Sequence, residues 1–148
     1  MKGNFISRIK LFLKDDGIVF FRFPAWHMPF GGHQQICRSK VCSKVPFTHL
    51  LPKVIYEKYL SLFKEKSSCI EELLSIKRSK MTIENFEFLC RKLDYEILDR
   101  TLWLINPHYK VKFNLPAIKL NSILTRLYYI RNYLSTSCYY IIKPLERE

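Results

Sequence analysis

Apolar positions along the chain fall into helically spaced segments and continuous apolar runs, and this pattern predicts the elements. Residues 5–14 repeat apolar side chains every three or four positions, which is typical of an amphipathic helix. Residues 18–23 (IVFFRF) form an almost unbroken apolar run that ends at Pro24, which cannot donate a hydrogen bond within a sheet. Such a strand is normally covered on both faces, as in the interior of a parallel sheet. We therefore predict a helix followed by a buried strand.

The remainder of the chain continues in the same way. After an irregular loop ending near Pro46, helical spacing predicts helices over residues 48–63, 68–74, 82–93 and 120–131. Ser68 and Glu71 have the spacing of a capping box, and Thr82 is the expected N-cap of the next helix. Apolar runs over 95–105 and 135–142 predict two more strands, with an irregular segment over 108–118.

This order of elements predicts an α/β fold with three strands in one partial domain, residues 1–148. We expect a helical insertion over 24–80, after the first strand, and a basic insertion over 107–134, between the last two strands. Three strands do not complete such a sheet, because an apolar strand left at an edge invites aggregation. The sequence therefore predicts that a missing N-terminal half or a partner chain completes the sheet.

The distribution of charge favours anionic partners. The 148 residues carry 25 Lys and Arg against 13 Asp and Glu, a net charge of +12. Residues 17–56 and 100–145 contain no acidic residue, so the surplus is concentrated in these two segments. Such a field suits a small anionic substrate, nucleic acid or a membrane surface.

Cysteine usage and hydropathy indicate the compartment. The five cysteines are odd in number, irregularly spaced and without a CxxC motif, which predicts reduced thiols in a cytoplasmic protein. Apolar runs never reach the roughly 18 residues of a transmembrane helix.

The loop after the first strand (PAWHMPFGGHQQIC) holds the candidate site. His33, beside Gly31 and Gly32, is either a general base or substrate-orienting group, or a structural histidine bonded to backbone. Gln34 and Gln35 either hydrogen-bond a polar substrate or cap the following helix. Apolar groups line most ligand sites, although loop aromatics more often anchor a loop on its core. The predicted substrate-side residues are Trp26, His27, Met28, Phe30, Gly31, Gly32, Gln34 and Gln35.

Two further groups of residues give weaker signals. His33, Cys37, Cys42 and His49 are suitable zinc ligands, but their spacing matches no standard zinc motif, and we assign no metal site. Bases and aromatic residues interleave in the C-terminal third, a pattern that can bind single-stranded nucleic acid. These residues are His108, Tyr109, Lys110, Lys112, Arg126, Tyr128, Tyr129 and Arg131. Because no nucleic-acid-binding signature accompanies them, a solvated face or a lid over an acidic substrate is favoured.

The segments FLKDDGIVFFRFP, PFGGHQQIC, INPHYKVKFNL and RNYLSTSCYYII together resemble the C-terminal half of class I S-adenosylmethionine-dependent methyltransferases. The resemblance covers essentially the whole chain, and PFGGHQQ is most similar to a bacterial subgroup. It implies a Rossmann-like fragment in which residues 18–23, 95–105 and 135–142 are strands five, six and seven. In that family the last strand lies antiparallel between the other two.

The resemblance also implies what this chain lacks. The family binds its cofactor through a Gly-rich loop in its N-terminal half, and the four glycines of this chain contain no GxGxG pattern. No cofactor-binding residue is therefore assigned, and S-adenosylmethionine is expected to bind the complete family fold but not this chain alone. The expected function is the substrate-side half of a methyltransferase, truncated and inactive by itself. The alternative is a non-enzymatic basic module that binds nucleic acid or completes a partner's sheet.

Overall fold

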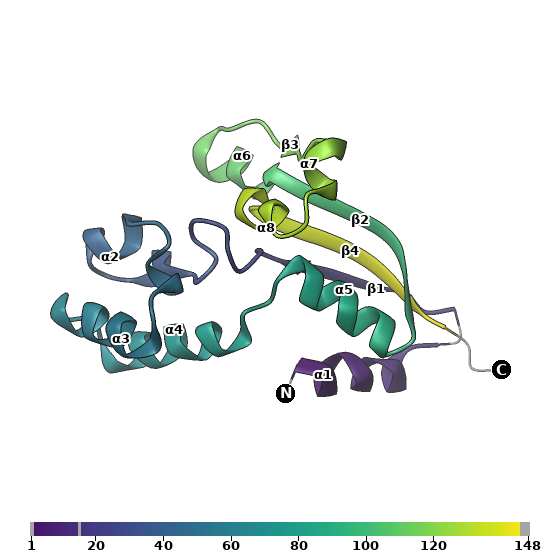
Figure 1. Ribbon diagram of the computed structural model, residues 1–148, viewed down its shortest axis with the longest axis horizontal. Coiled ribbons are helices and arrows are strands. Elements are labelled where there is room, and N and C mark those ends of the chain that lie inside the picture. The colour runs from purple at the N-terminus through teal and green to yellow at the C-terminus, as the bar shows by residue number, and fades with distance from the viewer. Residues whose placement is uncertain (1, 15, 146–148) are drawn as a thin grey trace. The chain divides into compact units, whose positions relative to one another are not determined.

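A computed structural model describes residues 2–14 and 16–145, without the side chains of residues 2–4 and 112. The chain divides into two compact units: unit 1 (Met1–Ala25 and Met81–Glu148) and unit 2 (Trp26–Lys80). Unit 1 contains the sheet, and unit 2 is built from helices and loops (Figure 1). The chain is therefore a mixed α/β protein, as predicted, and each unit is described by itself.

Unit 1 is a four-stranded sheet with helices. Its strands are β1 (Val19–Phe23), β2 (Tyr95–Ile105), β3 (Ile118–Lys119) and β4 (Ser137–Pro144). Its helices are α1 (Lys2–Ile9), the 3-10 helix η1 (Lys10–Phe12), α5 (Ile83–Lys92), α6 (His108–Phe113), α7 (Ser122–Arg126) and α8 (Ile130–Leu134). The strand order is β1-β4-β2-β3, and each hydrogen-bonded pair is antiparallel. No parallel Rossmann sheet is present among the described strands.

One topological prediction is confirmed. β4 lies between β1 and β2 and is antiparallel to both, in register from Val19↔Ile142 to Phe23↔Cys138 on one side. β1 and β2 therefore point in the same direction without pairing with each other. The additional strand β3 is a two-residue strand paired with the end of β2.

The prediction that residues 18–23 are covered on both faces is wrong. β1 is at one end of the sheet order, and its residues alternate between half-buried and exposed. Val19, Phe21 and Phe23 pack on the core of unit 1, whereas Phe20 is 58% exposed and lies 5.4 Å from Tyr139, ring centre to ring centre. The period of two in a strand separates these side chains onto opposite faces, although nearly all of them are apolar.

The core of unit 1 lies between the sheet and α5, which runs along one face of it (Figure 1). Phe86 of α5 contacts Phe21 and Phe23 of β1 and Tyr140 of β4, with ring centroids 4.6–5.2 Å apart. Alternate residues of β4 face this helix, which explains why Cys138, Tyr140 and Ile142 are fully buried.

Thr82 caps α5 as predicted, since its Oγ1 accepts a hydrogen bond from the Asn85 backbone N–H at 3.1 Å. Two other local predictions fail. The Ser68 capping box is wrong, because the helix begins at Ser67 and Ser68 lies inside it. Residues 108–118, predicted irregular, contain α6.

The single helix predicted over 120–131 is instead two short helices, α7 and α8. Tyr129 lies between them with φ at 64°, and its backbone N–H approaches Glu84 Oε1 at 3.3 Å. Arg131 is buried and pairs with Glu84 and Glu87 of α5, both at 2.9 Å. These contacts with α5 favour the broken path over a continuous helix.

Unit 2 packs two longer helices around a small core. Its elements are η2 (Gln34–Ile36), α2 (Lys40–Lys44), η3 (Thr48–Leu50), α3 (Lys53–Leu62) and α4 (Ser67–Ser79). Its buried cluster comprises Cys37, Cys42, Tyr56, Leu60, Leu73 and Leu74. Three of the chain's five free cysteines, Cys37, Cys42 and Cys69, thus lie in or against this core.

Candidate functional site

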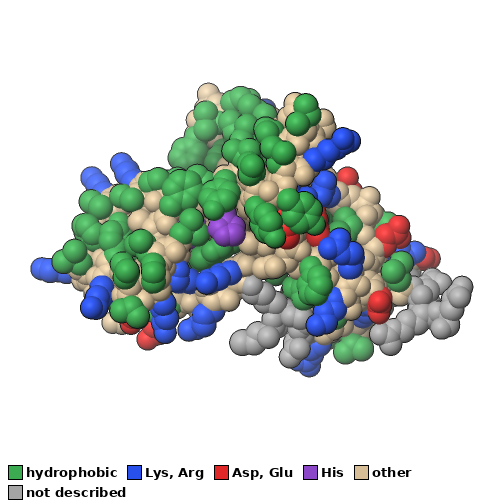
Figure 2. All heavy atoms as spheres, in the orientation of Figure 1, with side chains coloured by type: hydrophobic (Ala, Val, Ile, Leu, Met, Phe, Trp, Pro, Cys, Tyr) green, Lys and Arg blue, Asp and Glu red, His purple; other side chains and the backbone are tan. Residues whose placement is uncertain are grey.

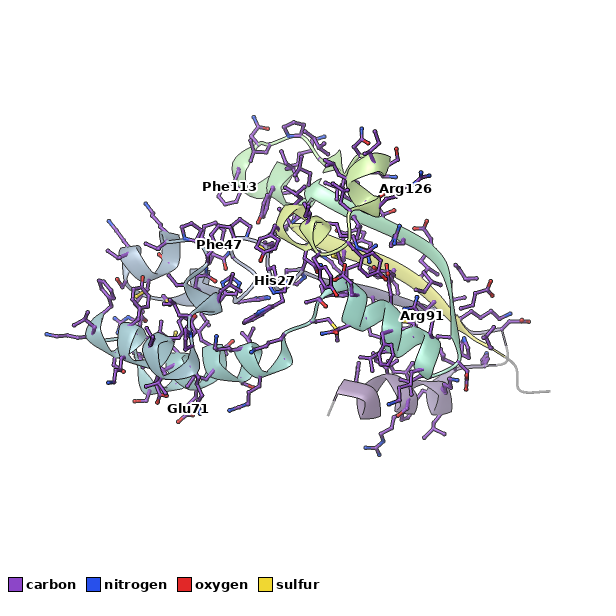
Figure 3. All side chains as sticks on the ribbon, viewed as in Figure 1. His27, Phe47, Glu71, Arg91, Phe113 and Arg126 are labelled. Carbon is purple, nitrogen blue, oxygen red and sulfur yellow. The ribbon has the colours of Figure 1, made fainter. Side chains whose placement is uncertain are left out.

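The predicted substrate-side loop forms the first part of unit 2, and most of it is buried. Trp26 is 5% exposed and Met28 is 3% exposed, and Gly31, Gly32 and Gln34 are also buried. His27 and Phe30 are half-buried; Figure 3 labels His27. By contrast, His33 and Gln35 are exposed, so they are the two candidates with side chains open to a ligand.

The loop is shaped by tight backbone turns. The Gly31 N–H donates to Met28 O at 3.0 Å, and the His33 N–H donates to Phe30 O at 3.1 Å. His33 itself adopts a left-handed conformation with φ at 58°, which is uncommon for a residue with a side chain. This turn directs the chain into η2 and leaves the His33 ring at the surface.

His49 organises the buried side of this loop. Its ring is fully buried, stands edge-on to Trp26 with centroids 4.7 Å apart, and its Nε2 lies 2.7 Å from Trp26 O. Burial lowers the pKa of His49 to about 4, and the charge of Lys77 adds to this effect, although the hydrogen bond to Trp26 opposes it. The imidazole is therefore neutral near pH 7, with Nε2–H as the donor.

Position 32 has no room for a side chain. A Cβ at this position would overlap the Cβ and Cγ of His49, and would lie 3.3 Å from Gln34 Oε1. Close packing of the loop backbone on the His49 side chain therefore explains the second glycine of PFGGHQQ.

Lys77 of α4 holds the 3-10 turn that carries His49. Its Nζ donates to His49 O at 2.5 Å and to Leu51 O at 2.6 Å, and it lies 5.7 Å from the centre of the Trp26 ring. Lys77 is only 7% exposed, and burial lowers its pKa, with the charge of Lys80 as a second cause. Its role is to satisfy carbonyl groups around the turn.

Gln34 has a structural role in the loop. Its Nε2 donates to Pro29 O at 3.1 Å, across the base of the loop. Its Oε1 has no hydrogen-bond partner among the described residues, nor do Thr48 Oγ1 and His49 Nδ1. Buried acceptors of this kind are normally satisfied by water or a ligand donor. Two of them, on Gln34 and His49, belong to the residues that surround Gly32.

The structure does not bring the four sequence-derived zinc candidates together. His33 is exposed, and His49 Nε2 is hydrogen-bonded to Trp26 O. Instead, Cys37 is brought beside Glu65 and Cys69, so that one ligand atom from each lies within 4.8 Å of the others. Glu65 was not singled out from the sequence, because its carboxylate binds backbone N–H groups 26 or more positions away and no local motif marks it. The basic run over residues 77–80 predicts a solvated helix end, and for Lys77 this is wrong, since its side chain is buried and donates to Leu51 O, 26 positions away.

The basic and aromatic pattern of the C-terminal third is only partly a surface. Arg126 is exposed on α7 (Figure 3), and Tyr128 and Tyr129 are 55% and 67% exposed. Arg131, however, is buried in its pairing with Glu84 and Glu87 and is not available to a ligand. The neighbouring segment is apolar at the surface (Figure 2), where the exposed residues include Val111, Phe113, Leu115 and Ile118.

Comparison with known proteins adds no assignment. No family model matches the chain, and neither a curated protein nor a solved structure is significantly similar to it. Among the described helices, none combines the length and apolar character needed to cross a bilayer.

Proposed function

We propose that this chain is the substrate-side half of an S-adenosylmethionine-dependent methyltransferase. The observation that carries the proposal is the position of β4, antiparallel between β1 and β2. This is the arrangement that the resemblance implies for strands seven, five and six. In the complete enzyme, a methyl group would pass from the cofactor sulfur to a substrate nucleophile by direct displacement, a step that depends mainly on positioning.

The exposed parts of the sheet support a half-fold. β1 has a hydrogen-bonded neighbour on one side, and on the face opposite the core Phe20 is 58% exposed. The residues before β1 in such a fold would continue the sheet at this edge. The Gly-rich loop of the family has no counterpart in this chain, so the cofactor would be held by that other half.

The predicted site residues fall into a buried group and an exposed group, and we assign a different role to each. Trp26, Met28 and Gln34 are buried and build the loop together with Gly31 and Gly32. His33 and Gln35 are exposed, and we assign them the contact with substrate. The His33 imidazole can orient a polar methyl acceptor by hydrogen bonding or act as the base that takes up its proton.

Calorimetric titration with S-adenosylmethionine tests the proposal. The isolated 148 residues should show no micromolar binding, because they contain no Gly-rich cofactor loop. Co-expression with the protein segment encoded next to this chain should create binding. Micromolar binding to this chain alone would contradict the half-site assignment. An adjoining sequence without a strand, Gly-rich loop and helix would remove the methyltransferase proposal.

The alternative of a basic nucleic-acid-binding module is tested separately by filter binding to single-stranded oligonucleotides at low and moderate salt. Phosphate contacts would give a steep salt dependence. The burial of Arg131 and the apolar surface near α6 lead us to expect no binding at low salt.

A further inference from the structure

Three metal-binding side chains of unit 2 converge beside the first turn of α4. Cys37 follows η2, Glu65 precedes α4, and Cys69 lies in its first turn. One Sγ from each cysteine and a carboxylate oxygen of Glu65 all lie within 4.8 Å of one another. In a tetrahedral zinc site, ligand atoms bound at about 2.0–2.3 Å are roughly 3.4–3.8 Å apart. Side-chain movements of about 1 Å would therefore bring these atoms to coordinating distance.

We propose that Cys37, Glu65 and Cys69 bind a zinc ion, with Cys42 as the fourth ligand. The Cys42 thiol interacts with that of Cys37 and belongs to the same buried cluster. Thiolate sulfur with one carboxylate oxygen suits zinc, whereas calcium and magnesium prefer sites made of oxygen alone. The site lies entirely within unit 2 and is independent of the proposed methyltransferase function.

Two backbone hydrogen bonds fix the position of the Glu65 carboxylate. Its Oε2 accepts from the Arg38 N–H at 3.0 Å and its Oε1 accepts from the Ser39 N–H at 2.8 Å. These two amides directly follow Cys37, so the carboxylate and the thiol are fixed to one short segment. Each carboxylate oxygen keeps a further lone pair that can coordinate a metal.

Glu65 is also a buried carboxylate without an ion-pair partner among the residues that the structure describes. It is 7% exposed. Burying an ionised carboxylate away from a cation is costly. A bound divalent ion would supply the missing positive charge.

The three thiols have raised pKa values, so coordination of a metal must displace their protons. Burial, together with the neighbouring Cys69 and Glu65, raises the pKa of Cys37 to about 12. Burial also raises the pKa of Cys42 and of Cys69. A bound cation reverses this effect and deprotonates the thiols that coordinate it. Zinc binding should therefore release one proton per coordinated thiol and weaken as the pH falls.

A purely structural or a redox role for these cysteines would give different results. In a structural role, the thiols would serve only as small apolar side chains in the core of unit 2. In a redox role, Cys37 and Cys69 would form a disulfide on oxidation. Neither role predicts a stoichiometric metal complex of the reduced chain.

Titration of the reduced chain with Co²⁺ under argon tests the proposal. We expect thiolate-to-cobalt charge-transfer absorption and intense tetrahedral d–d bands that saturate at one ion per chain and disappear when zinc is added. Cys37→Ser and Cys69→Ser should each abolish the charge-transfer signal, and Glu65→Gln should weaken binding about tenfold or more. Cys90→Ser, which alters a buried thiol of unit 1, is the matched control and should bind as the wild type does.

A second measurement on the wild-type chain decides the matter if the cysteine variants do not fold. Cys69 is half-buried, so its alkylation in the folded protein can be followed by peptide mass spectrometry. Zinc should slow this alkylation about tenfold or more, and a chelator should restore it. The absence of cobalt bands in the wild type, an alkylation rate unaffected by zinc, or a Cys37–Cys69 disulfide that forms despite equimolar zinc would each overturn the proposal.

Discussion

At the scale of single residues, His49 shows how a buried ring can hold a loop without being a catalytic group. Its Nε2–H is used by Trp26 O, its backbone carbonyl accepts from Lys77, and Gly32 packs on its side chain. Because the ring is neutral and enclosed, protonation would place a second positive charge near Lys77 in a site with little water. The stability of unit 2 should therefore depend on pH.

We expect the free energy of unfolding to fall as the pH drops from 6.5 toward 4. In this range the unfolded chain binds a proton at His49 that the folded chain, with its pKa near 4, does not. The loss should be on the order of 2 kcal/mol at about pH 5. Urea unfolding of a Trp103→Phe variant measures it, because Trp26 is then the remaining tryptophan of the chain and reports on unit 2.

The control for this prediction is His49→Gln in the same background. Glutamine can donate to Trp26 O but does not titrate, so the variant should be less stable at neutral pH and nearly insensitive to pH in this range. An unchanged pH slope in His49→Gln would show that another group causes it.

At the scale of elements, helix starts are decided by whether a side chain reaches the free backbone N–H groups. Thr82 does so, with its Oγ1 3.1 Å from the Asn85 nitrogen. Ser68 has a similar local sequence signal but lies within α4, which starts at Ser67 without a side-chain cap. Similar local sequence patterns therefore correspond to a helix cap at Thr82 and to no cap at Ser68.

Thr82→Ala should lower the free energy of unfolding by about 1 kcal/mol, since it removes an N-cap. Ser68→Ala should change it by less than about 0.5 kcal/mol, because the exposed hydroxyl caps nothing. Urea denaturation followed by far-ultraviolet circular dichroism compares the two variants. A larger loss in Ser68→Ala would mean that the capping box forms in solution.

At the scale of the whole molecule, the sheet of unit 1 has one well-packed face and an edge strand rich in aromatic residues. Phe20 lies on β1 beside Tyr139, and both are on the face opposite α5. Edge strands with exposed apolar side chains pair readily with other chains. In the proposed enzyme, this edge is where the other half of the sheet would add.

Phe20→Lys should reduce concentration-dependent self-association of the isolated chain, because a charged side chain on an edge strand opposes strand addition. Sedimentation velocity at several concentrations measures the effect. Phe88→Lys is a matched control, since Phe88 is 57% exposed but lies on α5. Equal effects of both substitutions would indicate general solubility and not a specific edge.

Much of the fold could be predicted from local patterns. The bounds of β2 match the predicted strand, Thr82 caps its helix, and the last strand lies between the other two. The break between α7 and α8 could not be predicted, because it depends on Glu84 and Glu87 more than 40 positions away. The contact between Lys77 and the backbone of His49 could not be predicted either, because no local motif connects these two residues.

The sequence by itself determined most of the helical and strand segments, and it marked residues 26–35 as the chemically distinctive loop. These features depend on spacing and on residue types within a few positions of one another. Only the tertiary structure decided that β1 is an edge strand, that His33 and Gln35 are exposed while Gln34 is buried, and that Cys37 meets Glu65 and Cys69. Burial and ligand clusters depend on contacts between distant segments, and residue spacing along the chain does not encode them.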